Sequence, residues 1–106
     1  MTEADIDIND PKFVRAVYDG AIEHLEKYGW VQSEVGGPEK PCCVIGALAA
    51  SCAENGYYGP LLSLCDPFRR AAGVSVPAIG AWNDRKGRTK EEVIEKLKEA
   101  RDSTLV

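Results

Sequence analysis

The four cysteines and the single histidine of this 106-residue chain carry its most distinctive chemistry. Cys42 and Cys43 are adjacent at the start of an apolar stretch, and His24 is the one residue that could serve them as a histidine base. Because a helix dipole lowers the pKa of a thiol in the first turn, either cysteine could be the nucleophile of a thiol enzyme. A lone cysteine and a lone histidine do not make a catalytic motif, so we favour a structural histidine and assign no catalytic residue.

The same cysteines raise the question of a bound metal. Cys42, Cys43, Cys52 and Cys65 contain no Cys-x-x-Cys spacing, and adjacent cysteines rarely bind one ion together. We therefore expect no metal and no other cofactor, and we interpret the cysteines as small buried hydrophobic residues. The N-terminal residues lack the basic and apolar regions of a secretory signal, which favours a cytoplasmic location with reduced thiols.

A basic turn is the second candidate site. Arg85, Lys86, Arg88 and Lys90 all lie within residues 85–90 and could contact phosphate groups. Against a nucleic-acid interface, the formal net charge is −4 and no helix-turn-helix pattern is recognisable. Nucleic-acid binding through this turn is therefore an alternative hypothesis.

One stretch predicts the element around which the others are arranged. Residues 41–53 are apolar on all sides and indicate a buried central helix, whose small face at Gly46 and Ala50 would let a neighbour approach closely. An amphipathic helix is predicted from Pro11, capped by Asp10, and a second follows Thr89. We expect these two helices to cover the central helix on both sides.

Prolines mark the shorter elements. Helices are predicted to begin at Pro60, Pro67 and Pro77, with a break near Asp66 because proline cannot continue a regular helix. The fold class is therefore all-α, a compact domain of five to six helices around the helix at residues 41–53. Residues 11–102 form this single domain, between an acidic N-terminal tail at 1–10 that is expected to fray and a loose C-terminus at 103–106. No apolar run approaches the roughly 20 residues that cross a bilayer, so no membrane partner is expected.

Several residues are expected to act structurally. Thr89 and Glu92 form a capping box, in which each side chain bonds the backbone of the other residue. Trp82 anchors the short helix that begins at Pro77, and Asn83 or Asp84 caps backbone groups in the turn that follows and pairs with Arg88. Trp30 is expected to fold back onto the core, and Gly46 to permit the close approach described above.

Residue groups spread along the chain resemble a small, uncharacterised domain family of actinobacteria and their phages. The groups are Gly29-Trp30, Cys43-x-x-Gly46-Ala47-Leu48, Trp82-Asn83-Asp84 and Arg88-Thr89, in that order. The resemblance covers roughly residues 13–100. It implies one domain and a prokaryotic or phage setting, and it implies no activity.

The leading functional hypothesis is a protein-interaction or regulatory module without enzymatic activity, such as a phage or mobile-element accessory that acts on a host protein. The exposed features that favour it are the Gly- and Pro-rich loop at residues 32–40, a pair of adjacent tyrosines and the basic turn. The alternatives are nucleic-acid binding through residues 85–90 and a thiol enzyme or metal protein that uses Cys42 and Cys43. The predicted interaction residues are Tyr57, Tyr58, Arg85, Lys86 and Arg88.

Overall fold

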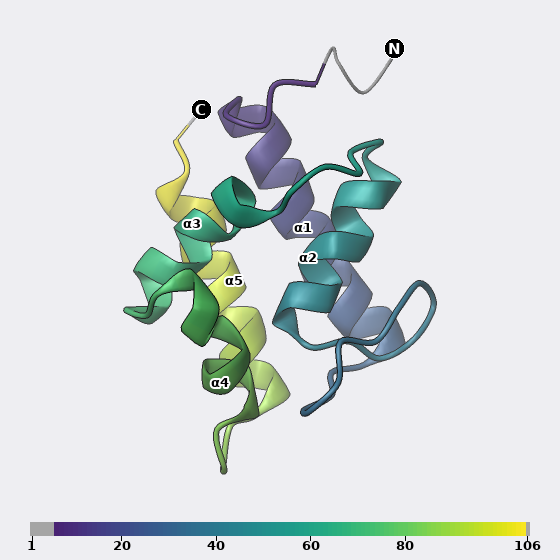
Figure 1. The fold of residues 1–106 in the computed structure, drawn as a ribbon, viewed down its shortest axis with the longest axis vertical. Helices are drawn as coiled ribbons and strands as arrows, with labels where there is room; N and C mark the ends of the chain where they lie inside the picture. The colour runs from purple at the N-terminus through teal and green to yellow at the C-terminus, as the bar shows by residue number, and fades with distance from the viewer. Residues whose placement is uncertain (1–5, 106) are drawn as a thin grey trace.

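The computed structural model describes residues 6–105 and shows one helical domain (Figure 1). Over this range it contains no strand, and its one β-bridge pairs Trp30 with Cys42. The all-α prediction is confirmed. Residues 1–5 of the predicted acidic tail and residue 106 lie outside the described range. The elements are α1 (Pro11–Tyr28), α2 (Val44–Glu54), α3 (Leu62–Ala72), the short 3-10 helix η2 (Val76–Ala78), α4 (Ile79–Asp84) and α5 (Lys90–Ser103).

Helix α1 begins and ends where its sequence predicts. The Lys12 backbone N–H donates to the Asp10 side chain at 2.9 Å, and Pro11 occupies the first helical position, where no backbone N–H is needed. Gly29 ends the helix with φ of 102°, a conformation that favours glycine, and its N–H donates to the Leu25 carbonyl. Both signals are local, so the sequence alone was enough to place this helix.

Helix α1, and not α2, lies between the two other long helices. It packs against α2 on one side and against α5 on the other, whereas the prediction placed the helix of residues 41–53 in that position. Gly20 explains the closeness of α1 to α2, because a Cβ at Gly20 would overlap the Ser51 hydroxyl. The largest fully buried side chains come from all five helices: Tyr18, Phe68, Leu25, Leu48, Leu64, Ile79 and Leu97.

Helix α2 begins three residues later than predicted. Cys42 pairs with the chain after α1: the Val31 N–H donates to the Cys42 carbonyl, and the Cys42 N–H donates to the Gly29 carbonyl. This pairing holds the backbone extended up to Cys43, which is the N-cap of the helix. The two adjacent cysteines therefore precede the first helical turn.

The small face of α2 is approached by a loop rather than by a helix. A Cβ at Gly46 would overlap the carbonyl oxygen of Val35, which accepts a hydrogen bond from the Cys43 N–H at 3.2 Å. The prediction that Gly46 permits a close approach is therefore confirmed. The neighbour is the backbone of the loop at residues 31–41.

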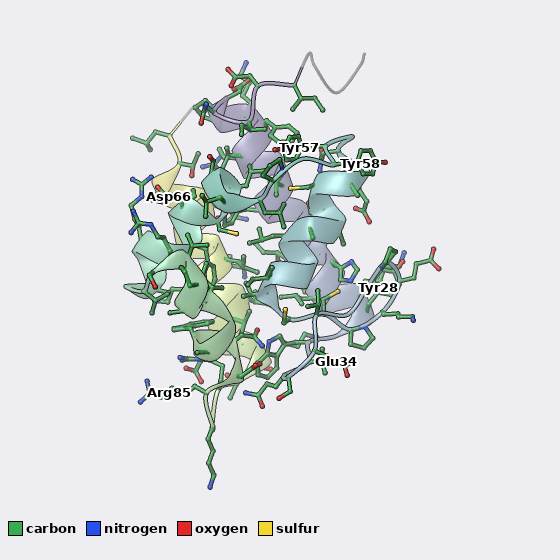
Figure 2. All side chains as sticks on the ribbon, in the orientation of Figure 1. Tyr28, Glu34, Tyr57, Tyr58, Asp66 and Arg85 are labelled. Carbon is green, nitrogen blue, oxygen red and sulfur yellow. The ribbon has the colours of Figure 1, made fainter. Side chains whose placement is uncertain are left out.

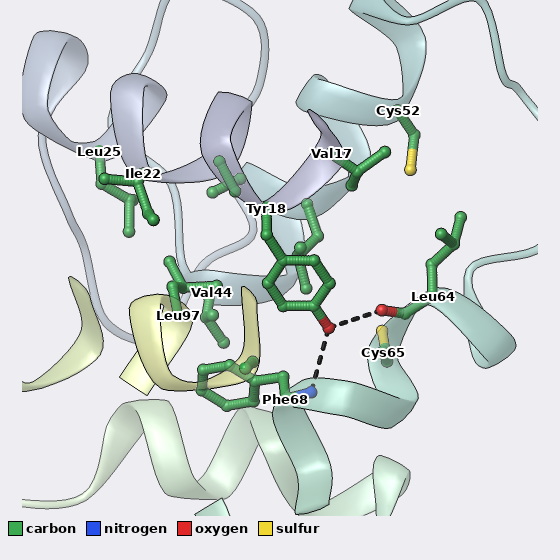
Figure 3. Packing of buried hydrophobic residues seen from close by; sticks show 14 of the residues in the cluster. Val17, Tyr18, Ile22, Leu25, Val44, Cys52, Leu64, Cys65, Phe68 and Leu97 are labelled. Atoms are coloured by element: carbon green, nitrogen blue, oxygen red, sulfur yellow. Dashed lines mark hydrogen bonds between the residues drawn. The ribbon is translucent and has the colours of Figure 1, made fainter. Parts of the chain in front are cut away.

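The predicted break near Asp66 is wrong, because α3 continues through Pro67 (Figure 3). The Tyr18 hydroxyl, from α1, donates to the Leu64 carbonyl at 2.6 Å and accepts from the Phe68 N–H at 3.1 Å. In a regular helix these two backbone groups would bond to each other, so the hydroxyl bridges the ladder where proline distorts it. Pro67 itself lacks the N–H that would donate to the Ser63 carbonyl, and the Tyr18 hydroxyl bridges the next step of the ladder.

The C-terminal half closes the domain. The predicted capping box is present, since the Glu92 N–H donates to the Thr89 hydroxyl and the Thr89 N–H donates to the Glu92 carboxylate. The Arg15 guanidinium donates to the carbonyls of Arg101 and Thr104, which ties the end of α5 to α1. None of the helices in the described part of the chain combines the length and the apolar character needed to cross a membrane.

Candidate functional site

The structure brings Cys42 and His24 together. The Cys42 sulfur lies 3.2 Å from His24 Nε2, and both side chains are buried beneath the loop that precedes α2. His24 Nε2 also lies 2.8 Å from the Lys40 carbonyl oxygen. Because a carbonyl oxygen can only accept a hydrogen bond, Nε2 carries the hydrogen and donates it to Lys40. The same nitrogen therefore has no lone pair with which to take the thiol proton of Cys42.

Cys42 is also not activated by its surroundings. Burial raises the pKa of its thiol and outweighs the opposing effect of the Gly37 backbone. A neutral thiol that donates to backbone carbonyls is inert, in contrast to the exposed, electropositive thiolates of cysteine enzymes. The pair therefore holds the loop at residues 37–42 onto α1.

The remaining cysteines do not add a reactive site. The Cys43 sulfur accepts a hydrogen bond from the Gly46 N–H at 3.4 Å, as the N-cap of α2. Burial raises the pKa of Cys52 to about 11 and also raises that of Cys65. All four cysteines are free, and no three potential metal ligands cluster among residues 6–105.

The basic turn offers less positive charge to a partner than its sequence suggests. The Arg88 guanidinium stacks on the Trp82 ring, 3.9 Å from the ring centroid, donates to the Trp82 carbonyl and pairs with Glu92 at 2.9 Å. Its side chain is only 11% exposed. In the view of Figure 2, Arg85 lies at the lower end of the molecule, at the turn between α4 and α5. Arg88 is thus a structural residue, and the basic charge open to a partner in this turn is reduced accordingly.

Asn83 is the structural centre of the Trp82-Asn83-Asp84 group. It is fully buried, and its side-chain oxygen accepts from Trp30 Nε1 at 2.7 Å and from the Val44 N–H at 3.1 Å. Its amide nitrogen donates to the Val31 carbonyl at 3.2 Å. One side chain therefore joins α4, the chain after α1 and the first turn of α2.

Asp84 extends this network at the surface. Its carboxylate accepts from the Ser33 N–H at 2.8 Å and from the Asn83 side chain at 3.0 Å, and these bonds lower its pKa. Gln32 donates to the carbonyls of Asn83 and Arg85 from the other side. The contacts of Trp30, Trp82 and Asp84 are thus structural, but Asp84 caps the Ser33 N–H of the loop after α1 and not the turn that follows it. The sequence analysis did not single out Asn83 as the residue that joins them.

The tyrosine pair divides between core and surface (Figure 2). Tyr57 is buried, its hydroxyl donates to the Pro60 carbonyl at 2.7 Å, and its ring meets Phe13 edge-on. Tyr58 is 75% exposed. Tyr57 therefore stabilises the turn before α3 and offers little surface to a partner.

An open groove of about 1060 Å³ lies between α3, the segment that leads into α1 and the end of α5. We call it the α3 groove. Two of the large hydrophobic side chains that the domain exposes border it, Leu62 (66% exposed) and Leu105 (80% exposed). Its apolar lining also includes Ile8, Pro11, Pro67 and Val76. None of the predicted interaction residues lies in it.

The charged residues of the α3 groove come mainly from α3. Asp66 forms ion pairs with Arg69 at 2.7 Å and with Arg70, and Asp66 and Arg70 both line the groove. Partial burial alone would raise the pKa of Asp66, but the hydrogen bonds from the two arginines outweigh it and lower the pKa. The α3 wall of the groove therefore carries one ionised acid beside one base, while Glu99, which pairs with Lys96, adds a second carboxylate from α5.

A sequence signal for the groove exists in α3. At 100° per residue, Leu62 falls on the side of the helix opposite to the buried Leu64 and Phe68. A leucine on the outer face of an amphipathic helix is a candidate contact. Leu105 has no such signal, because its position relative to α3 depends on the packing of the whole domain.

Comparisons with known proteins identify the family of the chain. No curated protein and no solved structure matches it. One family model matches residues 10–103, nearly the whole described domain. The chain therefore belongs to DUF6197, a family of unknown function.

Proposed function

We propose that the protein is a non-enzymatic protein-interaction module that binds polypeptide in the α3 groove. The observation that carries this proposal is the exposure of Leu62 and Leu105 at the same groove. Large apolar side chains that converge on a hollow with polar groups at its edge are typical of protein-binding surfaces. The proposal keeps the predicted class of function but moves the site away from the tyrosine pair and the basic turn.

The alternatives have less support. A thiol enzyme needs a thiolate and a base, but the Nε2 hydrogen of His24 is directed at Lys40 and the Cys42 thiol is protonated at neutral pH. Nucleic-acid binding needs a row of free cations, and Arg88 is held by Trp82 and Glu92. An actinobacterial or phage setting, with a host protein as the target, stays a prediction from the sequence resemblance.

Selection from a random-peptide display library on the sparsely immobilised protein tests the proposal. Peptides that bind the groove should bind Leu62→Glu at least about tenfold more weakly, because burial of one leucine side chain contributes about 1.5–3 kcal/mol. Val35→Glu is the matched control, since Val35 is also exposed (60%) but lies on the loop outside the groove. Circular dichroism would confirm that both variants are folded.

The two variants separate the possible results. Peptides that lose affinity for Leu62→Glu and keep it for Val35→Glu would support the proposal. If the library yields no binder, or if the selected peptides bind both variants as well as the original protein, the α3 groove is not a protein-binding surface.

A further inference from the structure

The charged residues of the α3 groove form a pattern along the helix. Leu62, Asp66 and Arg70 are spaced four residues apart on α3, so they form one ridge that faces the groove. Leu62 and Arg70 stand well out from the surface, with the Arg70 side chain 67% exposed. A partner that lies along this ridge must present a base opposite Asp66, an acid opposite Arg70 and an apolar group opposite Leu62.

A second copy of α3 presents these groups when it runs antiparallel to the first. With the two-fold axis between Asp66 and Arg70, the Asp66 carboxylate of each copy faces the Arg70 guanidinium of the other. Leu62 then faces the chain that follows α3, where Val74 and Val76 supply apolar side chains. A surface that carries one acid and one base at this spacing is thus complementary to itself, which is the requirement for a closed two-fold dimer.

The shape of the α3 groove allows the same arrangement. Helix α3 forms one wall of the groove, and residues 8–14 together with the end of α5 form the other. In a two-fold pair, the α3 ridge of each copy can enter the groove of the other copy beside its α3. Leu105, on the opposite wall, would then contact the partner's helix and lose its exposure to water.

We infer that the α3 groove is occupied by a second copy of this chain, in an antiparallel α3 pair held by exchanged Asp66–Arg70 ion pairs around apolar contacts of Leu62. This inference rests on the proposed function and names the partner. The charges provide the specificity, because like charges that face each other across an interface are unfavourable and opposite charges are favourable.

Charge reversal in two separate variants tests the pairing. Asp66→Arg would place two arginines against two arginines, and Arg70→Asp would place two acids against two acids, so each variant alone should dimerise at least tenfold more weakly. An equimolar mixture restores an acid opposite every base and should form the heterodimer. The ion pairs within α3 are partly exposed, so we expect their loss to have little effect on folding, and circular dichroism of each variant checks this.

Sedimentation velocity over a wide concentration series gives the readout. The inference predicts a concentration-dependent dimer of the original chain and of Val35→Glu, monomers of both reversal variants, and a dimer of their mixture. A chain that stays monomeric throughout, a dimer that neither reversal weakens, or a mixture that does not regain association would each overturn it. A monomer that still binds groove-dependent peptides would leave the proposed function intact and show that the occupant is another protein.

Discussion

Replacement of Tyr18 by phenylalanine tests how α3 tolerates a proline in its middle. The change removes one oxygen atom and keeps the buried ring. That oxygen accepts from the Phe68 N–H at 3.1 Å and donates to the Leu64 carbonyl at 2.6 Å, in a region without access to water. Without the hydroxyl, two buried backbone groups lose their partner at the point where Pro67 distorts the helix.

The expected cost follows from these two groups. A buried polar group left without a hydrogen bond costs about 1–3 kcal/mol, so the two groups together should lower the free energy of unfolding of Tyr18→Phe by about 2–6 kcal/mol. Since domains of this size are stable by about 5–15 kcal/mol, the loss is easily measured.

Urea unfolding followed by circular dichroism is the assay. Tyr57→Phe is the matched control, because its hydroxyl makes one bond to the Pro60 carbonyl in a partly exposed turn, and it should cost about 1 kcal/mol. The unfolding midpoint should fall with an unchanged slope. A Tyr18→Phe protein within about 0.5 kcal/mol of the original would show that the bridge contributes nothing and would refute the reasoning.

Three further predictions concern buried polar groups. Asn83→Ala leaves Trp30 Nε1 and backbone groups of two other segments unpaired, so it should destabilise the domain by at least about 3 kcal/mol in the same urea assay, and a smaller loss would contradict its central role. Iodoacetamide should label Cys42 slowly in the folded protein and much faster in urea, as followed by mass spectrometry; rapid labelling when folded would indicate an activated thiol. Burial raises the pKa of Cys52 from 9.0 to about 11 in the folded state. Its contribution to stability is therefore complete below pH 9 and is lost as the pH rises to 11, which amounts to about 3 kcal/mol. In Cys52→Ala the free energy of unfolding should therefore depend less on pH between pH 9 and pH 11. If its slope against pH is the same as in the original protein, Cys52 is not the group responsible.

The features predicted correctly depend on short stretches of chain. Asp10 and Pro11 start α1, Gly29 ends it, and Thr89 with Glu92 caps α5, each within one turn of helix. Such signals act through the nearest backbone groups and need no knowledge of the fold. The fold class, both ends of α1 and the start of α5 could therefore be predicted from the sequence, whereas α3 begins at Leu62 and α4 at Ile79, each two residues after the proline predicted to start it.

The errors and omissions concern partners that are distant in the sequence. Pro67 indicates a break at Asp66 by its local effect alone, but the hydroxyl that bridges the helix ladder at this point comes from α1. The pairing of Cys42 with the chain after Gly29 likewise delays the start of α2, although residues 41–43 have no local obstacle to a helix. Single-sequence reasoning could not choose between these outcomes, because the deciding hydrogen bonds exist only once the domain is packed.

The candidate site shows the same division. The sequence by itself determined the helical class of the fold, both ends of α1 and the start of α5, because capping and periodicity are properties of neighbouring residues. Only the tertiary structure decided that Arg88 is held by Trp82, that Nε2 of His24 donates to Lys40, and that Leu105 stands across a groove from Leu62. Whether a side chain is open to a partner depends on what the rest of the chain places around it, and that is settled by packing.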